Sequence, residues 1–175
     1  EQKNFFQNLF NLSSYDKVIL HAGWIHDAMC VDQFAKASRA WKEEFKLVLH
    51  EREKRSPNEN FIRYVSELSD GKALLSLEPV SFDRMDEVFS SAHIGLIAYD
   101  KKYGGGRENA HKASGKLGQY LKCGIPVVAL DLPGYKEMFE KYKCGLVFND
   151  FGQNEKCIET ILDDYENYRN ESIRC

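Results

Sequence analysis

The chain has 175 residues, of which 43% are hydrophobic and 29% charged, and its formal net charge is −3 at pH 7. This length is enough for one domain with a hydrophobic core, and the small negative charge gives no electrostatic signature of nucleic-acid binding. No apolar run approaches the roughly 18 residues that span a bilayer, and no secretory signal pattern is present. Because the chain begins at Glu1 rather than Met, we expect it to be an excised piece of a longer protein or a processed product.

The five cysteines and five histidines do not form a recognisable metal or disulfide pattern. None of the cysteines forms a Cys-x-x-Cys pair, and their number is odd. His21 and His26 lie five residues apart with no third ligand nearby. We therefore expect reduced thiols in a reducing compartment and no metal site.

Residues 1–17 are predicted to be a lead-in segment, and residues 18–175 a single domain. Six short apolar runs in that domain are predicted strands: Val18–Leu20, Leu47–Leu49, Ala73–Leu77, Ile94–Ala98, Pro126–Leu130 and Gly145–Phe148. Segments with helical spacing of apolar residues separate them, such as Val31, Phe34 and Ala35 at i, i+3 and i+4. A single final helix is expected over Cys157 to Tyr168. Strands buried on both faces with helical crossovers predict a mostly parallel six-stranded α/β sheet with helices on both faces.

A segment without apolar periodicity, residues 99–113, precedes a helix that begins near Ser114 and stops at Gly124. Loops of this length in compact domains tend to be functional or mobile, and we expect the GGGR stretch, residues 104–107, to be a mobile flap. Ser114 is a candidate N-cap, and Gly124 occupies the position of a left-handed helix stop.

Chemistry is expected at the carboxyl ends of the strands, where open parallel sheets bind their ligands. The helix that begins at Ser114 would offer free N–H groups and the positive end of its dipole there, which favours phosphate. Lys116 in its first turn adds a positive charge, and Gln119 shares its face. A cation beside a neutral amide suits a phosphate next to a sugar hydroxyl, although a solvated helix face explains the same pattern.

The segment ASGKLGQYLKCGIPVVALDLPGYKEMFEKYKCGLVF, residues 113–148, resembles the C-terminal half of a GT-B glycosyltransferase of the large retaining family 4. Members of that family often read Ser-Pro-x-Lys-Leu-x-Glu-Tyr-(Leu/Met)-Ala-x-Gly-x-Pro-Val-Val here. The resemblance continues upstream through SLEPVSFDRMDEVFSSAHIGLIAY and VILHAGWIHDAMCVDQFAKA, so it covers residues 18 to 165. The combined pattern is specific, whereas each motif alone is weak.

The resemblance implies a Rossmann-like domain that binds a nucleotide-diphosphate sugar and faces an N-terminal acceptor domain that this chain lacks. It implies that no metal or other cofactor is needed, because the helix dipole and basic side chains stabilise the departing diphosphate. Lys116 and His111 would be the catalytic residues. The implied donor-binding residues are Gly23, Trp24, Glu78, Pro79, Val80, Ser114, Gly115, Lys116, Leu117 and Gln119.

The sequence departs from the family pattern at two pairs of positions. The Glu-x7-Glu pair of the family maps to His111 and Gln119, so both carboxylates are absent. Trp24 and Met29 stand where many members carry basic residues, which leaves Arg107 or Lys112 of the long loop to supply a second cation. Gln119 can still donate to and accept from hydroxyl groups, but without charge assistance.

The predicted function is the donor-binding half of a retaining glycosyltransferase of the hexosyltransferase type that makes a polysaccharide or glycolipid. Its expected partners are a UDP-, GDP- or ADP-linked sugar and the missing acceptor domain, in the cytoplasm, with membrane contact only through that other half. A non-catalytic nucleotide-binding subunit that docks on a separate acceptor chain is the main alternative. A sugar-nucleotide epimerase would need paired acidic and histidine residues, and a response-regulator-like module would need clustered acidic residues after the first strand.

Overall fold

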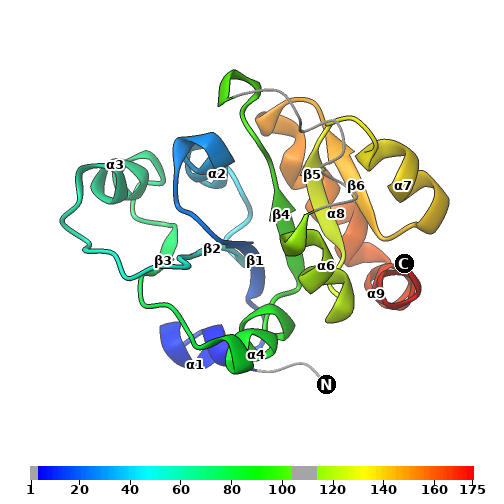
Figure 1. Ribbon diagram of the computed structural model, residues 1–175, viewed down its shortest axis with the longest axis horizontal. Coiled ribbons are helices and arrows are strands. Elements are labelled where there is room, and N and C mark those ends of the chain that lie inside the picture. The colour runs from blue at the N-terminus through cyan, green and yellow to red at the C-terminus, as the bar shows by residue number, and fades with distance from the viewer. Residues whose placement is uncertain (1–3, 104–113) are drawn as a thin grey trace.

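The computed structural model describes residues 4–103 and 114–175. It contains one six-stranded sheet in the order β3-β2-β1-β4-β5-β6, with every neighbouring pair parallel (Figure 1). The strands are β1 (Lys17–Ala22), β2 (Phe45–His50), β3 (Leu74–Ser76), β4 (Ile94–Ile97), β5 (Val127–Leu130) and β6 (Gly145–Phe148). All six predicted strands are thereby confirmed, and the strand order reverses direction between β1 and β4.

Helices cover both faces of the sheet. They are α1 (Phe5–Phe10), α2 (Val31–Ser38), α3 (Asn60–Leu68), α4 (Met85–Ser90), α6 (Gly115–Lys122), α7 (Tyr135–Tyr142), α8 (Asn154–Asp163) and α9 (Tyr165–Arg174). Buried side chains of α2, α3 and α8 form one core cluster with alternate strand residues such as Ile19 and Val128. Those of α1, α4, α6 and α7 form a second cluster with Leu20 and Val127. The predicted three-layer α/β fold is therefore confirmed.

The lead-in segment contains helix α1, whose Phe6 is fully buried in the second core cluster. The same helix is held to the domain by Gln7, whose Nε2 donates to the Ser91 carbonyl over 3.2 Å. Figure 1 shows α1 beside α4. The first residues described thus extend the core, and the Phe6 ring lies 5.8 Å from the ring of His50 at the carboxyl end of β2.

The single final helix expected from the sequence is wrong, because the structure has two helices there. Helix α8 ends at Asp163 and α9 begins at Tyr165, with Asp164 between them at φ −128° and ψ 40°. That conformation is not helical, so the chain changes direction. Tyr165 and Tyr168 still pack against the first core cluster, which is why the apolar spacing looked continuous.

Tyr120 fastens helix α6 to the centre of the sheet. Its ring lies against Gly95 of β4 so closely that a Cβ at Gly95 would be 2.6 Å from the ring atoms. Its hydroxyl donates to the Leu20 carbonyl over 2.7 Å and accepts from the Ala22 N–H over 3.2 Å. The start of α6 is thus held beside the end of β1, which is the geometry that positions the candidate site.

No helix in residues 4–103 or 114–175 is long and apolar enough to cross a membrane.

Candidate functional site

A cavity of about 400 Å³ opens at the carboxyl edge of the sheet, between the start of α6 and the loops that follow β1, β2 and β3. We call it the Lys116 cavity. The predicted site residues that line it are Gly23, Trp24, Pro79, Val80, Gly115, Lys116 and Gln119. The structure therefore brings together predicted residues from three separate segments, and Lys116 and Gln119 line the same cavity.

The start of α6 has the geometry predicted for an N-cap. Ser114 has extended backbone, and its Oγ accepts the N–H of Leu117 over 3.2 Å. The N–H groups of Gly115 and Lys116 belong to the first helical turn, which has no acceptor within the helix, and they lie at the positive end of its dipole. Leu117 points its side chain into the core, where it is 3% exposed. The cap therefore occupies the Leu117 N–H, whereas the N–H groups of Gly115 and Lys116 make no backbone hydrogen bond within residues 4–103 and 114–175.

Lys116 is partly buried, and its ammonium group lies 3.5 Å from Nε2 of the fully buried His21. Burial lowers the pKa of Lys116 to about 7, an effect that the negative charge of Glu51 opposes. Burial and the nearby lysine hold the pKa of His21 well below its usual range, so His21 is neutral. His21 Nε2 also lies 3.2 Å from the Trp24 carbonyl oxygen. A lysine whose pKa is lowered by burial gains its charge readily when an anion binds, as expected of a binding or catalytic group.

Gly23, the residue after β1, allows Lys116 to approach the loop closely. It has φ +123°, a conformation that other residues rarely adopt. A Cβ at this position would lie 3.4 Å from Lys116 Cε and 3.5 Å from its Nζ. The absence of a side chain at Gly23 therefore shapes the wall beside the ammonium group.

Glu51 is a fully buried carboxylate in the wall of the Lys116 cavity. Its Oε2 accepts from the Ile25 N–H over 3.0 Å and from Arg55 Nη1 over 3.2 Å, and its Oε1 accepts from the Arg52 N–H over 2.8 Å. Such a set of donors satisfies a buried charge, which is otherwise expensive to keep out of water. Glu51 therefore connects the loop after β2 to the loop after β1.

Gln119 and the loop after β3 form a further part of the lining of the Lys116 cavity. Gln119 Oε1 is buried and has no hydrogen-bond partner within the described part of the chain. Pro79 and Val80 line the cavity, whereas the predicted Glu78 does not, because its carboxylate pairs with Lys54 Nζ at 2.9 Å on the surface. The amide oxygen of Gln119 is thus an acceptor that a ligand hydroxyl would satisfy.

The sequence pattern assigned no ligand-binding role to His21, Glu51 or Arg52. His21 and Glu51 sit in or beside apolar strands and carry no motif of their own. Conversely, the predicted His111 lies outside the described residues, as do Arg107 and Lys112. Within residues 4–103 and 114–175, no group of three or more His, Cys, Asp and Glu side chains is arranged to hold a metal ion.

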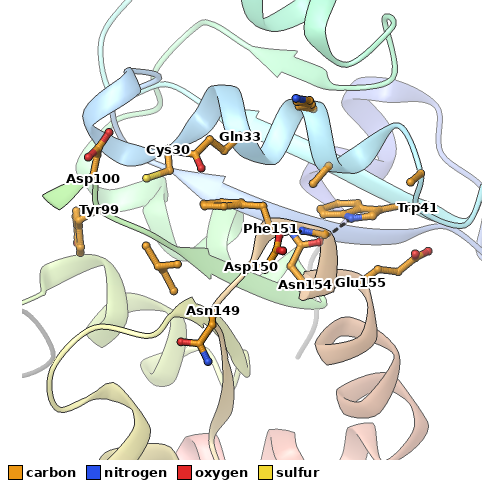
Figure 2. Close-up of a pocket in the computed structure, with 15 residues that line it drawn as sticks. Cys30, Gln33, Trp41, Tyr99, Asp100, Asn149, Asp150, Phe151, Asn154 and Glu155 are labelled. Carbon is orange, nitrogen blue, oxygen red and sulfur yellow. Dashed lines mark hydrogen bonds between the residues drawn. The ribbon is translucent and has the colours of Figure 1, made fainter. Parts of the chain in front are cut away.

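A second, larger cavity of about 810 Å³ lies at the same edge, between α2 and the segment that joins β6 to α8. We call it the Trp41 cavity. Figure 2 shows Gln33 and Trp41 on one side and Asp150, Phe151 and Asn154 on the other, with the Trp41 indole N–H donating to Asn154 Oδ1. That bond is 2.9 Å long. Tyr99 lines both cavities, so the two meet beside the end of β4.

The charges in the two cavities differ in sign. Asp100, Asp150 and Glu155 line the Trp41 cavity together with one lysine, Lys36. The Lys116 cavity is lined by two cations, Lys116 and Arg52, and one carboxylate, Glu51, whose oxygens already accept three donors. An anionic ligand therefore fits the smaller cavity better than the larger one.

No protein-family model matches the sequence, and no curated protein matches it significantly. Solved structures do match the fold. Anabaena HepE in complex with UDP and glucose gives a TM-score of 0.72 at 10% identity, over 97% of this chain and 45% of that one. WaaG, a glycosyltransferase involved in lipopolysaccharide biosynthesis, gives 0.68 at 15% identity, over 97% and 44%. Sucrose-phosphate synthase from Thermosynechococcus elongatus gives 0.69 at 15% identity, over 95% and 41%.

These similarities establish the fold of the chain as a Rossmann-like half of the GT-B type. The chain spans less than half the length of each of the three structures.

Proposed function

We propose that this chain is the donor-binding half of a glycosyltransferase and that it holds the diphosphate of a nucleotide sugar over the start of α6. One observation supports this most strongly: Lys116, with its ammonium group partly buried at a helix start, lines one cavity with Gln119, Trp24 and the loop after β3. A diphosphate there would meet the ammonium group of Lys116 and the first N–H groups of α6, and Gln119 would meet a hydroxyl group of the ribose. Solved structures of the same fold include one in complex with UDP and glucose.

In this proposal Lys116 also serves the reaction. Negative charge builds up on the departing diphosphate in the transition state, and a cation fixed at that point stabilises it. We further propose the finer assignments made from the resemblance: a retaining hexosyltransferase of family 4 that makes a polysaccharide or glycolipid without a metal. The acceptor-binding half would come from a separate domain, so we expect the chain alone to bind a nucleotide and to transfer no sugar.

Gln119 favours a second candidate, a nucleotide-binding subunit that does not catalyse transfer. Its neutral amide stands where a carboxylate would give charge-assisted bonds to hydroxyl groups, and its oxygen is left without a partner in the described part of the chain. Such a subunit would use the same cavity, so nucleotide binding supports both candidates. Sugar transfer after the acceptor-binding half is supplied would distinguish them.

The test is calorimetric titration of UDP, GDP, ADP and CMP into the wild-type chain and into Lys116→Ala. We expect one diphosphate nucleotide to bind and Lys116→Ala to weaken it by about 10- to 100-fold, because a charged hydrogen bond contributes about 1.5–3 kcal/mol. Lys36→Ala is the matched control, since this lysine lines the Trp41 cavity. If no nucleotide binds, or if both variants lose equal affinity, the proposal is wrong.

A further inference from the structure

Arg52, the second residue after β2, lies at the wall of the Lys116 cavity beside Trp24. The parallel register pairs Ala22 with His50, so the loops that follow β1 and β2 leave the sheet side by side. The guanidinium carbon of Arg52 lies 4.5 Å from the centre of the Trp24 ring. Trp24 is 47% exposed, and a cation over an indole face is held by the charge distribution of the ring.

The positive charge of Arg52 is not neutralised by the buried carboxylate next to it. Glu51 accepts the backbone N–H of Arg52, while its side-chain cation partner is Arg55. The guanidinium of Arg52 instead has Glu53 nearby, with Nε 3.8 Å from Oε1 and both side chains more than half exposed. An exposed pair at that distance is weak, so the guanidinium is available to another anion.

We propose that Arg52 is the second phosphate ligand of the Lys116 cavity, that Lys116 and Arg52 each bind one phosphate of a diphosphate, and that Trp24 positions Arg52. This inference rests on the proposed function. A diphosphate carries at least two negative charges, and Lys116 alone leaves one of them without a cation. A planar guanidinium can bind phosphate oxygens through two N–H groups, and the indole beneath it fixes the plane in which they point. The cavity then selects diphosphates over monophosphates.

The experiment compares UDP, UMP and inorganic pyrophosphate by calorimetry on the wild type, Arg52→Ala and Arg174→Ala. Arg174 is a matched control, because it is a 74%-exposed arginine paired with Glu171 at the end of α9. We expect Arg52→Ala to weaken UDP and pyrophosphate about tenfold and UMP by less than about threefold, and Arg174→Ala to change nothing. Equal losses for UDP and UMP, or no loss for either, overturn the inference.

The same experiment separates this inference from the proposed function. If pyrophosphate binds through Arg52 but no nucleotide binds, the donor-binding function is wrong and Arg52 remains a phosphate ligand. If UDP binds through Lys116 and Arg52→Ala has no effect, the function stands and the inference is wrong. If neither probe binds the wild type, both are wrong. Unchanged thermal unfolding of Arg52→Ala shows that the variant is folded.

The positioning role of Trp24 is tested by a double-mutant cycle with Trp24→Ala and Arg52→Ala, with Trp24→Phe as the conservative variant. We expect Trp24→Ala to weaken UDP about threefold in the wild type and to have no effect in the Arg52→Ala background. Trp24→Phe should retain most of the affinity, because it keeps an aromatic face. If Trp24→Ala weakens uridine, UMP and UDP equally in both backgrounds, Trp24 stacks on the nucleoside and the positioning role is refuted.

Discussion

The two cavities at the carboxyl edge share Tyr99 and the same sheet, yet they are lined by different charged side chains. The larger Trp41 cavity lies between α2 and α8 and is lined by amides and three carboxylates. The smaller Lys116 cavity lies at the start of α6 and is lined by two cations and by a carboxylate that already accepts three donors. The neutral His21 lies beside Lys116 without lining the cavity. We therefore propose the smaller cavity as the anion site because of its balance of charges and not because of its size.

Anion binding at the Lys116 cavity should depend strongly on pH above neutrality, which would distinguish this cavity from the Trp41 cavity. Because burial lowers the pKa of Lys116 to about 7, the free chain loses this charge as the pH rises through 7. An anion that needs the charged form must then bind together with a proton. We expect UDP affinity to fall by up to about tenfold per pH unit between pH 7 and 8.5. Titration calorimetry at several pH values measures this.

Lys116→Arg is the control for that pH dependence, because arginine stays charged over this range. Affinity that is flat with pH in Lys116→Arg and steep in the wild type supports the assignment. Titration of His21 does not contribute to the pH dependence of UDP affinity in this range, because its pKa is held well below its usual range and it remains neutral. A wild-type affinity that does not change between pH 7 and 8.5 contradicts the role given to Lys116.

Two glycines, one beside each cavity, provide a matched pair of substitutions. Gly23→Ala adds a side chain at φ +123° and within 3.5 Å of Lys116 Nζ, so we expect a loss of about 1–3 kcal/mol in the free energy of unfolding and weaker UDP binding. At Gly152, in the Trp41 cavity, the added Cβ would lie 3.4 Å from Asp150 Oδ1, so the change should stay within about 0.5 kcal/mol. Urea denaturation of both variants measures this, and equal losses would show that the loop after β1 is not constrained as described.

Trp41→Phe should change stability without changing function. The substitution removes the indole N–H that donates to Asn154 Oδ1, and Asn154 Nδ2 is already buried without a partner in the described part of the chain. Leaving this amide wholly unsatisfied costs about 1–2 kcal/mol. We expect thermal unfolding at a lower temperature and unchanged UDP affinity. A loss of UDP affinity in Trp41→Phe would mean that the two cavities are coupled, for example through Tyr99.

The sequence predicted the strands and the start of α6 because their signals are local. Each strand is a short apolar run, and Ser114, Lys116 and Gln119 lie on one turn and face of a single helix. The contributions of His21 and Arg52 could not be predicted in that way. They depend on the register of β1 against β2, which places Ala22 opposite His50 and so joins two loops that lie far apart in the chain. The break at Asp164 was missed because the apolar spacing continues across it.

The hydroxyl of Tyr120 reaches from α6 to the backbone at the end of β1, while its ring lies on Gly95. These contacts tie α6, which carries Lys116, to the end of β1, after which Gly23 follows. We therefore expect the separation between Lys116 and the loop after β1 to change little when a ligand binds. A cavity that is preorganised in this way loses little conformational entropy when its ligand binds. Tyr120→Phe removes both hydrogen bonds of this hydroxyl, so we expect it to reduce the affinity for UDP even though Tyr120 does not line the cavity.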